Sequence, residues 1–178
     1  APGYYQFSDL NAGSYQVEFT LPNGYIFTRQ NAGNDIYDSD ADRVTGRTGT
    51  YTLGWGGSNQ TADAGIVQPA SLGDYIWYDG NDNGLQDDGP NVTVGAGANG
   101  GMNGIYVELL DGSGNPVDID LGTSGVQNRV ITANDGGGNP GYYLFENLIP
   151  GDYQVFFNLA GSPALPLGGT NNANYVFA

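Results

Sequence analysis

Residues 2–19 read PGYYQFSDLNAGSYQVEF, and residues 140–157 read PGYYLFENLIPGDYQVFF. Eleven of these 18 positions are identical at a constant offset of 138 residues, so the chain contains one repeat twice. Tyr15, Val17 and Phe19 recur at every second position, as do their counterparts in the second copy, and this is the period of a β-strand. The repeat therefore predicts an all-β chain.

The offset also indicates how the chain is divided. Similarity resumes at GYIFT (24–28) and, loosely, at NYVFA (174–178). We interpret residues 1–68 as the latter part of one unit, residues 69–70 as a short linker, and residues 71–178 as the front and central part of the next unit, without its last strands. A linker this short favours a semi-rigid array of units over freely jointed ones.

Short apolar runs between Gly, Asn and Asp turns predict the individual strands. Leu10 and Leu148 enter the turn before the repeated strand, and we expect both to belong to a core. The predicted strands lie near residues 3–7, 14–20, 25–28, 50–54, 63–67, 73–78, 104–110, 126–133, 141–145, 152–158 and 174–177.

Composition excludes several classes of function. The formal net charge is −15, 16 of the 19 acidic residues are Asp, the four cations are all Arg, and Lys, His and Cys are absent. A basic surface for nucleic acid is therefore missing, as are disulfides, thiolate metal sites and the commonest catalytic side chains. The apolar runs are too short to span a membrane. We expect a protein that is not an enzyme.

The sharpest motif follows the run GDYIWY and reads DGNDNGLQDD over residues 79–88. Its spacing places oxygen donors at alternate positions, with a glycine at the sixth, as in the first half of a calcium loop. The alternative is a polar turn without an ion. The candidate ligands are Asp79, Asn81, Asn83, the carbonyl of Leu85, and Asp87 or Asp88.

A second acidic cluster occupies residues 34–42. An extended segment would place three alternate carboxylates on one side, where a divalent cation would offset their repulsion. A solvated acidic loop is the alternative. The candidate ligands here are Asn34, Asp35, Asp38, Asp40 and Asp42.

Three further residues are weaker candidates. Asp63 and Asp74 flank the short linker and could hold an ion at the junction of the two units, although an ordinary surface position is the favoured interpretation of each. Trp55 lies among glycines in LGWGG and is a candidate for stacking against a glycan, because an exposed aromatic ring offers a flat apolar face.

Three stretches resemble the B domains of serine–aspartate-repeat (SdrD-type) surface adhesins. They are SLGDYIWYDGNDNGLQDDG, GYYLFENLIPGDYQVFF and NAGNDIYDSDADRVTGRTGTYTL with the later DAGIV. The resemblance implies tandem Greek-key β-sandwiches of immunoglobulin-like or prealbumin-like type, with calcium (Ca²⁺) at both Asp-rich loops, including Asp38, Asp40 and Asp42 at the second. It also implies that calcium rigidifies the array. Related domains carry a Lys–Asn cross-link, which a chain without lysine cannot form.

Together these features predict a calcium-stiffened spacer, stalk or filament module of an extracellular, cell-surface protein. Its expected partners are neighbouring repeat units of the same or identical chains, and an extracellular or host-surface ligand. One alternative is a carbohydrate- or protein-binding module of an adhesin. Another is a filament subunit that assembles head to tail, with residues 29–67 of one chain completing the second unit of its neighbour by strand donation.

Overall fold

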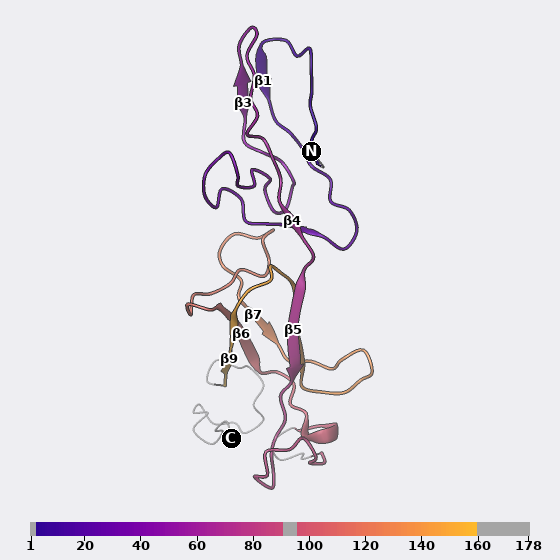
Figure 1. The fold of residues 1–178 in the computed structure, drawn as a ribbon. Helices are drawn as coiled ribbons and strands as arrows, with labels where there is room; N and C mark the ends of the chain where they lie inside the picture. Colours follow the sequence, from indigo (N-terminus) through magenta and orange to yellow (C-terminus); the bar gives the residue numbers. More distant parts are fainter. Residues whose placement is uncertain (1–2, 91–95, 160–178) are drawn as a thin grey trace. The chain divides into compact units, whose positions relative to one another are not determined.

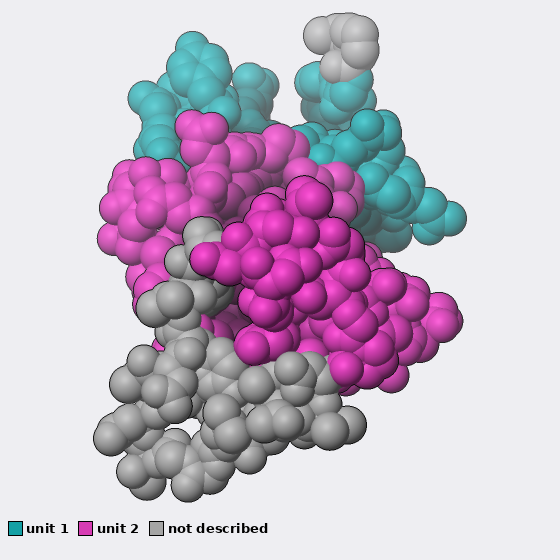
Figure 2. All heavy atoms as spheres, turned by 90° about the horizontal axis from the view of Figure 1, so that it is seen from below, with its two compact units in different colours: residues 1–68 teal, residues 69–178 magenta. Residues whose placement is uncertain are grey.

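The structure is a computed structural model that describes residues 3–90 and 96–159 (Figure 1). It consists of short strands and turns, with a single-turn 3-10 helix (η1, Ala98–Gly100) among the described residues. The all-β prediction is confirmed. The chain divides into two compact units, Ala1–Gln68 and Pro69–Ala178, which Figure 2 colours separately. That each unit is part of a larger repeat stays a prediction.

The second unit contains two antiparallel sheets. Strand β5 (Ala70–Tyr75) pairs with β8 (Tyr142–Leu148), and a three-stranded sheet has the order β7-β6-β9. In that sheet β6 (Tyr106–Asp111) lies between β7 (Arg129–Ile131) and β9 (Tyr153–Asn158). Both sheets bury one face because their apolar residues recur at every second position. The two faces meet as a β-sandwich.

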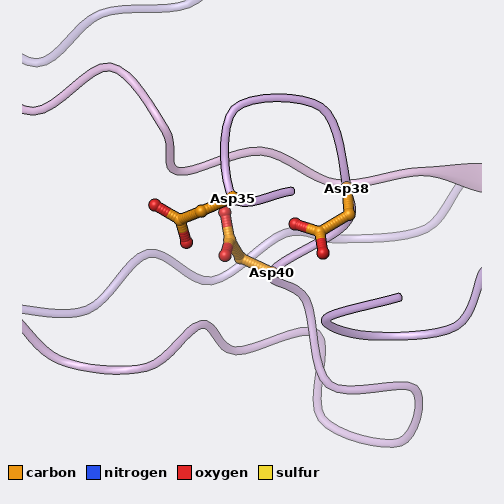
Figure 3. Close-up of side chains that lie close together, drawn as sticks. All are labelled: Asp35, Asp38 and Asp40. Atoms are coloured by element: carbon orange, nitrogen blue, oxygen red, sulfur yellow. The ribbon is translucent and has the colours of Figure 1, made fainter. Parts of the chain in front are cut away.

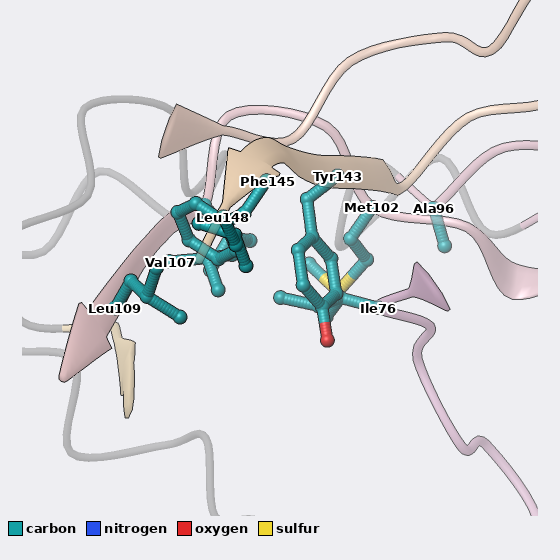
Figure 4. Close-up of a cluster of buried hydrophobic side chains, with 9 residues drawn as sticks. Ile76, Ala96, Met102, Val107, Leu109, Tyr143, Phe145 and Leu148 are labelled. Atoms are coloured by element: carbon teal, nitrogen blue, oxygen red, sulfur yellow. The ribbon is translucent and has the colours of Figure 1, made fainter. Parts of the chain in front are cut away.

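The core of the second unit forms between these sheets (Figure 4). Val107 and Leu109 of β6 are fully buried, as is Phe145 of β8. The rings of Tyr143 in β8 and Phe157 in β9 meet edge to face, with centroids 5.8 Å apart, so the contact joins the two sheets. Leu148 is buried in this core, as predicted.

The first unit has shorter strands and a different interior. Strand β1 (Gly13–Tyr15) pairs with β3 (Tyr51–Leu53), and β2 (Ile26–Phe27) pairs with β4 (Ile66–Val67). Its buried hydrophobic residues, within the described range, are Phe27 and Ala41. They are accompanied by three buried polar residues, Ser39, Asp40 and Thr48. Hydrophobic burial therefore contributes much less to this unit than to the second.

Two strand predictions in the first unit need correction. Residues 3–7 form no strand, and the strand predicted at 14–20 is limited to Gly13–Tyr15. In the second unit the equivalent of 3–7 lies in β8, whose backbone hydrogen bonds go to β5. Among the described residues of the first unit, none pairs with 3–7 in this way, so the segment remains outside the sheets. Leu10 is exposed, against the prediction that it belongs to a core.

The predicted strand at 174–177 lies outside the described residues. Apart from 3–7, every other predicted strand overlaps an observed one, although β5 begins and ends three residues earlier than expected. A search of the described residues found no helix with the length and apolar character needed to cross a membrane.

A hydrogen-bonded turn ties the start of β8 to the end of β5. Asp135 Oδ1 accepts hydrogen bonds from the backbone N–H groups of Gly137 (2.8 Å) and Asn139 (2.7 Å), and Oδ2 accepts one from the Tyr75 hydroxyl (2.6 Å). These bonds, that from Tyr75 foremost, hold the pKa of Asp135 well below its usual range. The same bond raises the pKa of Tyr75 to about 12.

Equivalent leucines of the two repeat copies should respond differently to truncation. Leu148→Ala should lower the free energy of unfolding of the second unit by about 2–5 kcal/mol, because it leaves a cavity in a packed core. Leu10→Ala should lower that of the first unit by less than about 1 kcal/mol, because this side chain is exposed. Hydrogen exchange measured peptide by peptide separates the two units. Equal losses would contradict the difference in packing.

The Tyr75–Asp135 bond should give stability a specific pH dependence. The folded pKa of Asp135 is below its unfolded value of 3.8, so the stabilisation is present above that pH and is lost as pH falls through the folded pKa. Tyr75→Phe removes the largest cause of the lowering. We therefore expect the variant to melt below the unmodified chain at pH 7, and the difference between the two melting temperatures to be smaller at about pH 3, between the unfolded and the folded pKa.

Tyr142→Phe is the matched control, because its ring packs on Tyr75, with centroids 5.3 Å apart, while the Tyr75–Asp135 bond is kept. Its melting temperature should differ from that of the unmodified chain by the same amount at both pH values. A constant difference for Tyr75→Phe as well would rule out the assigned role of this bond.

Candidate metal centres

The loop at residues 79–88 follows β5 by three residues, and the first of these, Ile76, is buried in the core of the second unit. The Tyr78 N–H donates to the Gly100 carbonyl (2.8 Å) and anchors the start of the loop. Asp82 (φ 56°) and Gly84 (φ 74°) then adopt the left-handed conformation. Gly accepts this conformation without strain and Asp tolerates it, so the sequence DNG permits the sharp turn that the loop makes.

Four of the predicted ligands come together in this loop. Asp79 accepts hydrogen bonds from the backbone N–H groups of Asn83 (3.2 Å) and Gly84 (2.7 Å). The amide of Asn83 donates to both carboxylate oxygens of Asp87 (3.2 Å each), and the amide of Asn81 approaches Asp87 Oδ1 at 3.4 Å. The amide N–H groups of Asn81 and Asn83 face Asp87, while their amide oxygens accept hydrogen bonds from the backbone N–H groups of Asn83 and Leu85. That these four residues bind one cation stays a prediction.

The electrostatics of the loop favour a bound cation. The N–H of Gly84, followed by that of Asn83, lowers the pKa of Asp79, so its carboxylate is fully charged at neutral pH. Carboxylate and amide oxygens are the donors that hard divalent cations prefer. The donor set in this loop therefore fits calcium.

The two remaining candidates in the loop have other surroundings. Asp88 Oδ2 accepts a hydrogen bond from the Gly80 N–H (2.9 Å) and closes the loop at its base. Leu85 is exposed, and its N–H donates to Asn83 Oδ1 (2.8 Å). That the carbonyl of Leu85 or the carboxylate of Asp88 binds an ion stays a prediction.

Three carboxylates of the first unit form a compact acidic group (Figure 3). Asp35, Asp38 and Asp40 each offer one oxygen, and these oxygens lie within 4.8 Å of one another. Asp35 is exposed, Asp38 is half-buried and Asp40 is buried. Charges this close, at a site partly removed from water, repel one another unless a cation or protons offset them.

One oxygen of this group lacks a partner. Asp38 Oδ2 accepts a hydrogen bond from the Gly33 N–H (2.6 Å), but Asp38 Oδ1 is buried and accepts none from the described residues. Buried polar atoms are nearly always satisfied, so such an oxygen calls for an explanation such as a bound ion or water. The group thus fits an oxygen-coordinated cation by position and by chemistry.

Asp63 lies beside this acidic group in the first unit. Its N–H donates to Asp40 Oδ2 (3.0 Å), and its carbonyl accepts from the Asp40 N–H (3.0 Å). Burial and then the charges of Asp40, Asp38 and Asp35 raise the pKa of Asp63. Sequence reasoning missed this neighbourhood because it joins residues 23 positions apart.

The side chains of Asp42 and Asn34 stabilise turns next to the acidic group by accepting hydrogen bonds from the backbone. Asp42 Oδ1 accepts hydrogen bonds from the N–H groups of Thr45 (2.7 Å) and Val44 (3.1 Å), which with the Thr45 hydroxyl lower the pKa of Asp42. Asn34 Oδ1 accepts one from the Ile36 N–H (3.0 Å). The segment is therefore not extended throughout, and Asp35 joins Asp38 and Asp40. Ligand roles for Asp42 and Asn34 stay predictions.

The two remaining candidate residues are Asp74 and Trp55. Asp74 lies in β5 opposite Tyr143, whose pKa is raised by burial and then by the charge of Asp74. An ion shared by Asp63 and Asp74 stays a prediction. Trp55 follows β3 in a turn closed by the Gly57 N–H and the Gly54 carbonyl (3.0 Å), and its side chain is 87% exposed.

The sequence matches the family model of the SdrD B-like domain at residues 1–66 and again at residues 70–172. Serine-aspartate repeat-containing protein F of Staphylococcus epidermidis (strain ATCC 12228 / FDA PCI 1200) is 36% identical over 160 residues, or 88% of this chain. Serine-aspartate repeat-containing protein D of Staphylococcus aureus (strain MW2) is 37% identical over 157 residues, or 87% of it. The chain spans 8% and 10% of the length of these two relatives. No solved structure matches it.

Charge-matched substitutions should separate a ligand of the 79–88 loop from its neighbour. Asp79→Asn should weaken calcium binding at this loop about tenfold or more, because it removes the charged oxygen at the first ligand position of the motif. Asp82→Asn removes the same charge at a position whose left-handed backbone Asn also accepts, so its effect should stay below about threefold. Isothermal titration calorimetry measures both. Equal losses would mean that net charge alone attracts the ion.

Proposed function

The chain belongs to the SdrD B-like domain family, and on that premise we propose that it is a calcium-stiffened structural module of an extracellular surface protein. Its family confirms the prediction that it is not an enzyme, because SdrD B-like domains are structural modules. The proposal also gives the ion a structural role. Calcium would hold closed the two Asp-rich loops and so make each unit rigid.

The acidic group of Asp35, Asp38 and Asp40 is the observation that carries this proposal. Without a cation, three carboxylates within 4.8 Å of one another oppose the folded arrangement of residues 34–42. With a divalent cation the same three groups favour it. An ion that binds only the folded state stabilises that state by mass action.

The two units differ in how much they need such an ion. The described part of the first unit buries few hydrophobic residues, and its interior includes Asp40. An ion bound by Asp35, Asp38 and Asp40 would also affect the position of Asp63, because Asp63 and Asp40 are joined by two hydrogen bonds. The second unit has a larger core, and its loop at 79–88 lies outside that core. We therefore propose that calcium is structural for the first unit and mainly orders a loop in the second.

The proposed location and partners follow from this role. Calcium modules outside cells bind the ion at about 10⁻⁴–10⁻³ M, a range that cytosolic calcium does not sustain. The repeated sequence and the two family matches favour neighbouring repeat units as the main partners. We propose that the full protein uses these modules at the surface of the cell, as part of an adhesin.

A second candidate function rests on Trp55. A ring that is 87% exposed at the tip of a turn resembles the stacking platforms that bind glycans. In that case the module would bind a surface carbohydrate as well as acting as a spacer. Quenching of the fluorescence of Trp55 by oligosaccharides, absent in Trp55→Ala, distinguishes this role from a purely structural one.

Removal of calcium should destabilise the protein. At a calcium concentration a hundredfold above the dissociation constant, one site stabilises the folded state by about 2.7 kcal/mol, so excess chelator should lower the melting temperature markedly. It should also expose residues 34–42 and 79–88 to proteolysis. The double variant Asp40→Asn/Asp79→Asn is the control, and its melt should respond little to chelator. A chelator-independent melt, with no metal found by elemental analysis, would sink the proposal.

A further inference from the structure

Two tyrosines of the second unit lie opposite each other on paired strands. Tyr75 of β5 and Tyr142 of β8 are partners in the antiparallel register. Both the N–H and the carbonyl of Tyr142 bond to Ala133 (2.9 Å each), so neither is available to β5. Tyr75 and Tyr142 are therefore a non-hydrogen-bonded pair, the kind in which the two side chains approach most closely.

The rings of this pair are in contact and accessible. Their centroids lie 5.3 Å apart, the angle between their planes is 54°, and both side chains are half-buried. Half-buried side chains can still change rotamer, so the two rings are able to approach further without unfolding of the strands.

A carboxylate faces the phenolic hydrogen of Tyr75. The hydroxyl donates to Asp135 Oδ2 (2.6 Å), while Asp135 Oδ1 is held by the backbone N–H groups of Gly137 and Asn139. The turn therefore fixes the carboxylate and, through it, the Tyr75 ring. A base at hydrogen-bond distance can accept the proton that a phenol releases when its ring loses an electron.

The composition of the chain leaves few other routes to a covalent cross-link. It has no cysteine for a disulfide and no lysine for a Lys–Asn bond, but it has 13 tyrosines. β5 and β8 form a two-stranded sheet, and the segment between them contains β6 and β7. A bond between Tyr75 and Tyr142 would close this segment into a loop and so reduce the conformational freedom of the unfolded chain.

We propose that Tyr75 and Tyr142 form a dityrosine cross-link between β5 and β8 when the protein meets a one-electron oxidant of the peroxidase type. Each phenol gives one electron to the oxidant and loses one proton, from Tyr75 to Asp135 and from Tyr142 to water. The two phenoxyl radicals join through the carbon ortho to each oxygen. The hydrogen on each joined carbon leaves as a proton and each oxygen regains one, so the net change is one new C–C bond and the loss of two electrons and two protons.

Oxidation of the dilute full chain tests this proposal. The one-electron oxidant is a ruthenium tris-bipyridyl complex, activated by light in the presence of persulfate. We expect a monomer by size-exclusion chromatography that emits dityrosine fluorescence and is lighter by two hydrogen atoms. Its digest should contain one linked pair of peptides, joined at Tyr75 and Tyr142. The linked chain should melt about 5 °C or more above the unmodified one.

Phenylalanine variants provide the matched comparison. Tyr75→Phe and Tyr142→Phe should each lower the dityrosine yield of the monomer about tenfold or more, because coupling within a preformed pair is far faster than coupling between separate groups. Tyr37→Phe is the control. The Tyr37 side chain is 85% exposed, so its removal tests whether exposure alone decides which tyrosines couple, and the monomer yield should not change.

The role of Asp135 has a separate test. Asp135→Asn keeps the size of the side chain and both phenols, but it should lower the monomer yield about threefold or more, because the base is lost. Excess acetate, a soluble carboxylate, should restore part of the yield. A purely structural role of Asp135 would give no such recovery, and an unchanged yield would rule it out as the proton acceptor.

Three results would overturn the cross-link itself: dityrosine found only in oligomers, a monomer linked at other tyrosines, or an undiminished monomer yield in Tyr142→Phe. Tyr142→Phe keeps the bond between Tyr75 and Asp135, so a loss of the fold does not obscure this comparison. The proposal does not rest on calcium, and excess chelator should leave the yield unchanged. A chelator-independent melt would count against the calcium proposal alone.

Discussion

The antiparallel pairing of β8 with β5 is the constraint on which the second unit depends. It sets the register that turns Tyr143 and Phe145 toward β6 and β9, and it holds the Gly141 turn against the backbone at Ile76. In the first unit, the equivalent residues 3–7 have no such pairing with any described strand. The same aromatic rings keep their mutual geometry there, yet they remain in water and residues 3–7 form no strand. Strand formation is thus a property of the pair of strands.

This dependence explains which features were predictable from the sequence. The alternation of Tyr153, Val155 and Phe157 is local, and the structure forms the expected strand there. The turn residues of the 79–88 loop are local as well, and the structure shows a tight turn held by Asp79. Residues 3–7 carry a similar pattern to β8, so no local signal could show that they pair with no strand among the described residues. The proximity of Asp63 to Asp40 depends on how distant segments pair, and the capping role of Asp42 depends on a turn that the alternation of Asp residues conceals.

The acidic composition acquires a structural meaning from the contrast between the units. In the second unit, hydrophobic side chains of two sheets make the core, and the Asp residues lie in loops and turns. In the first unit a carboxylate, that of Asp40, is part of the interior. A unit that buries a charge in place of hydrophobic surface must obtain stability from whatever neutralises that charge. We therefore expect solution conditions to affect the two units unequally.

The lengths of the strand pairings also determine how the chain would respond to a pulling force. Six residue pairs join β6 to β9, whereas two join β2 to β4 and three join β1 to β3. Under tension the shorter pairings would rupture first, and each residue released would add about 3.5 Å of slack. In such a chain the first unit would extend at low force, while the β6–β9 sheet of the second unit remained intact.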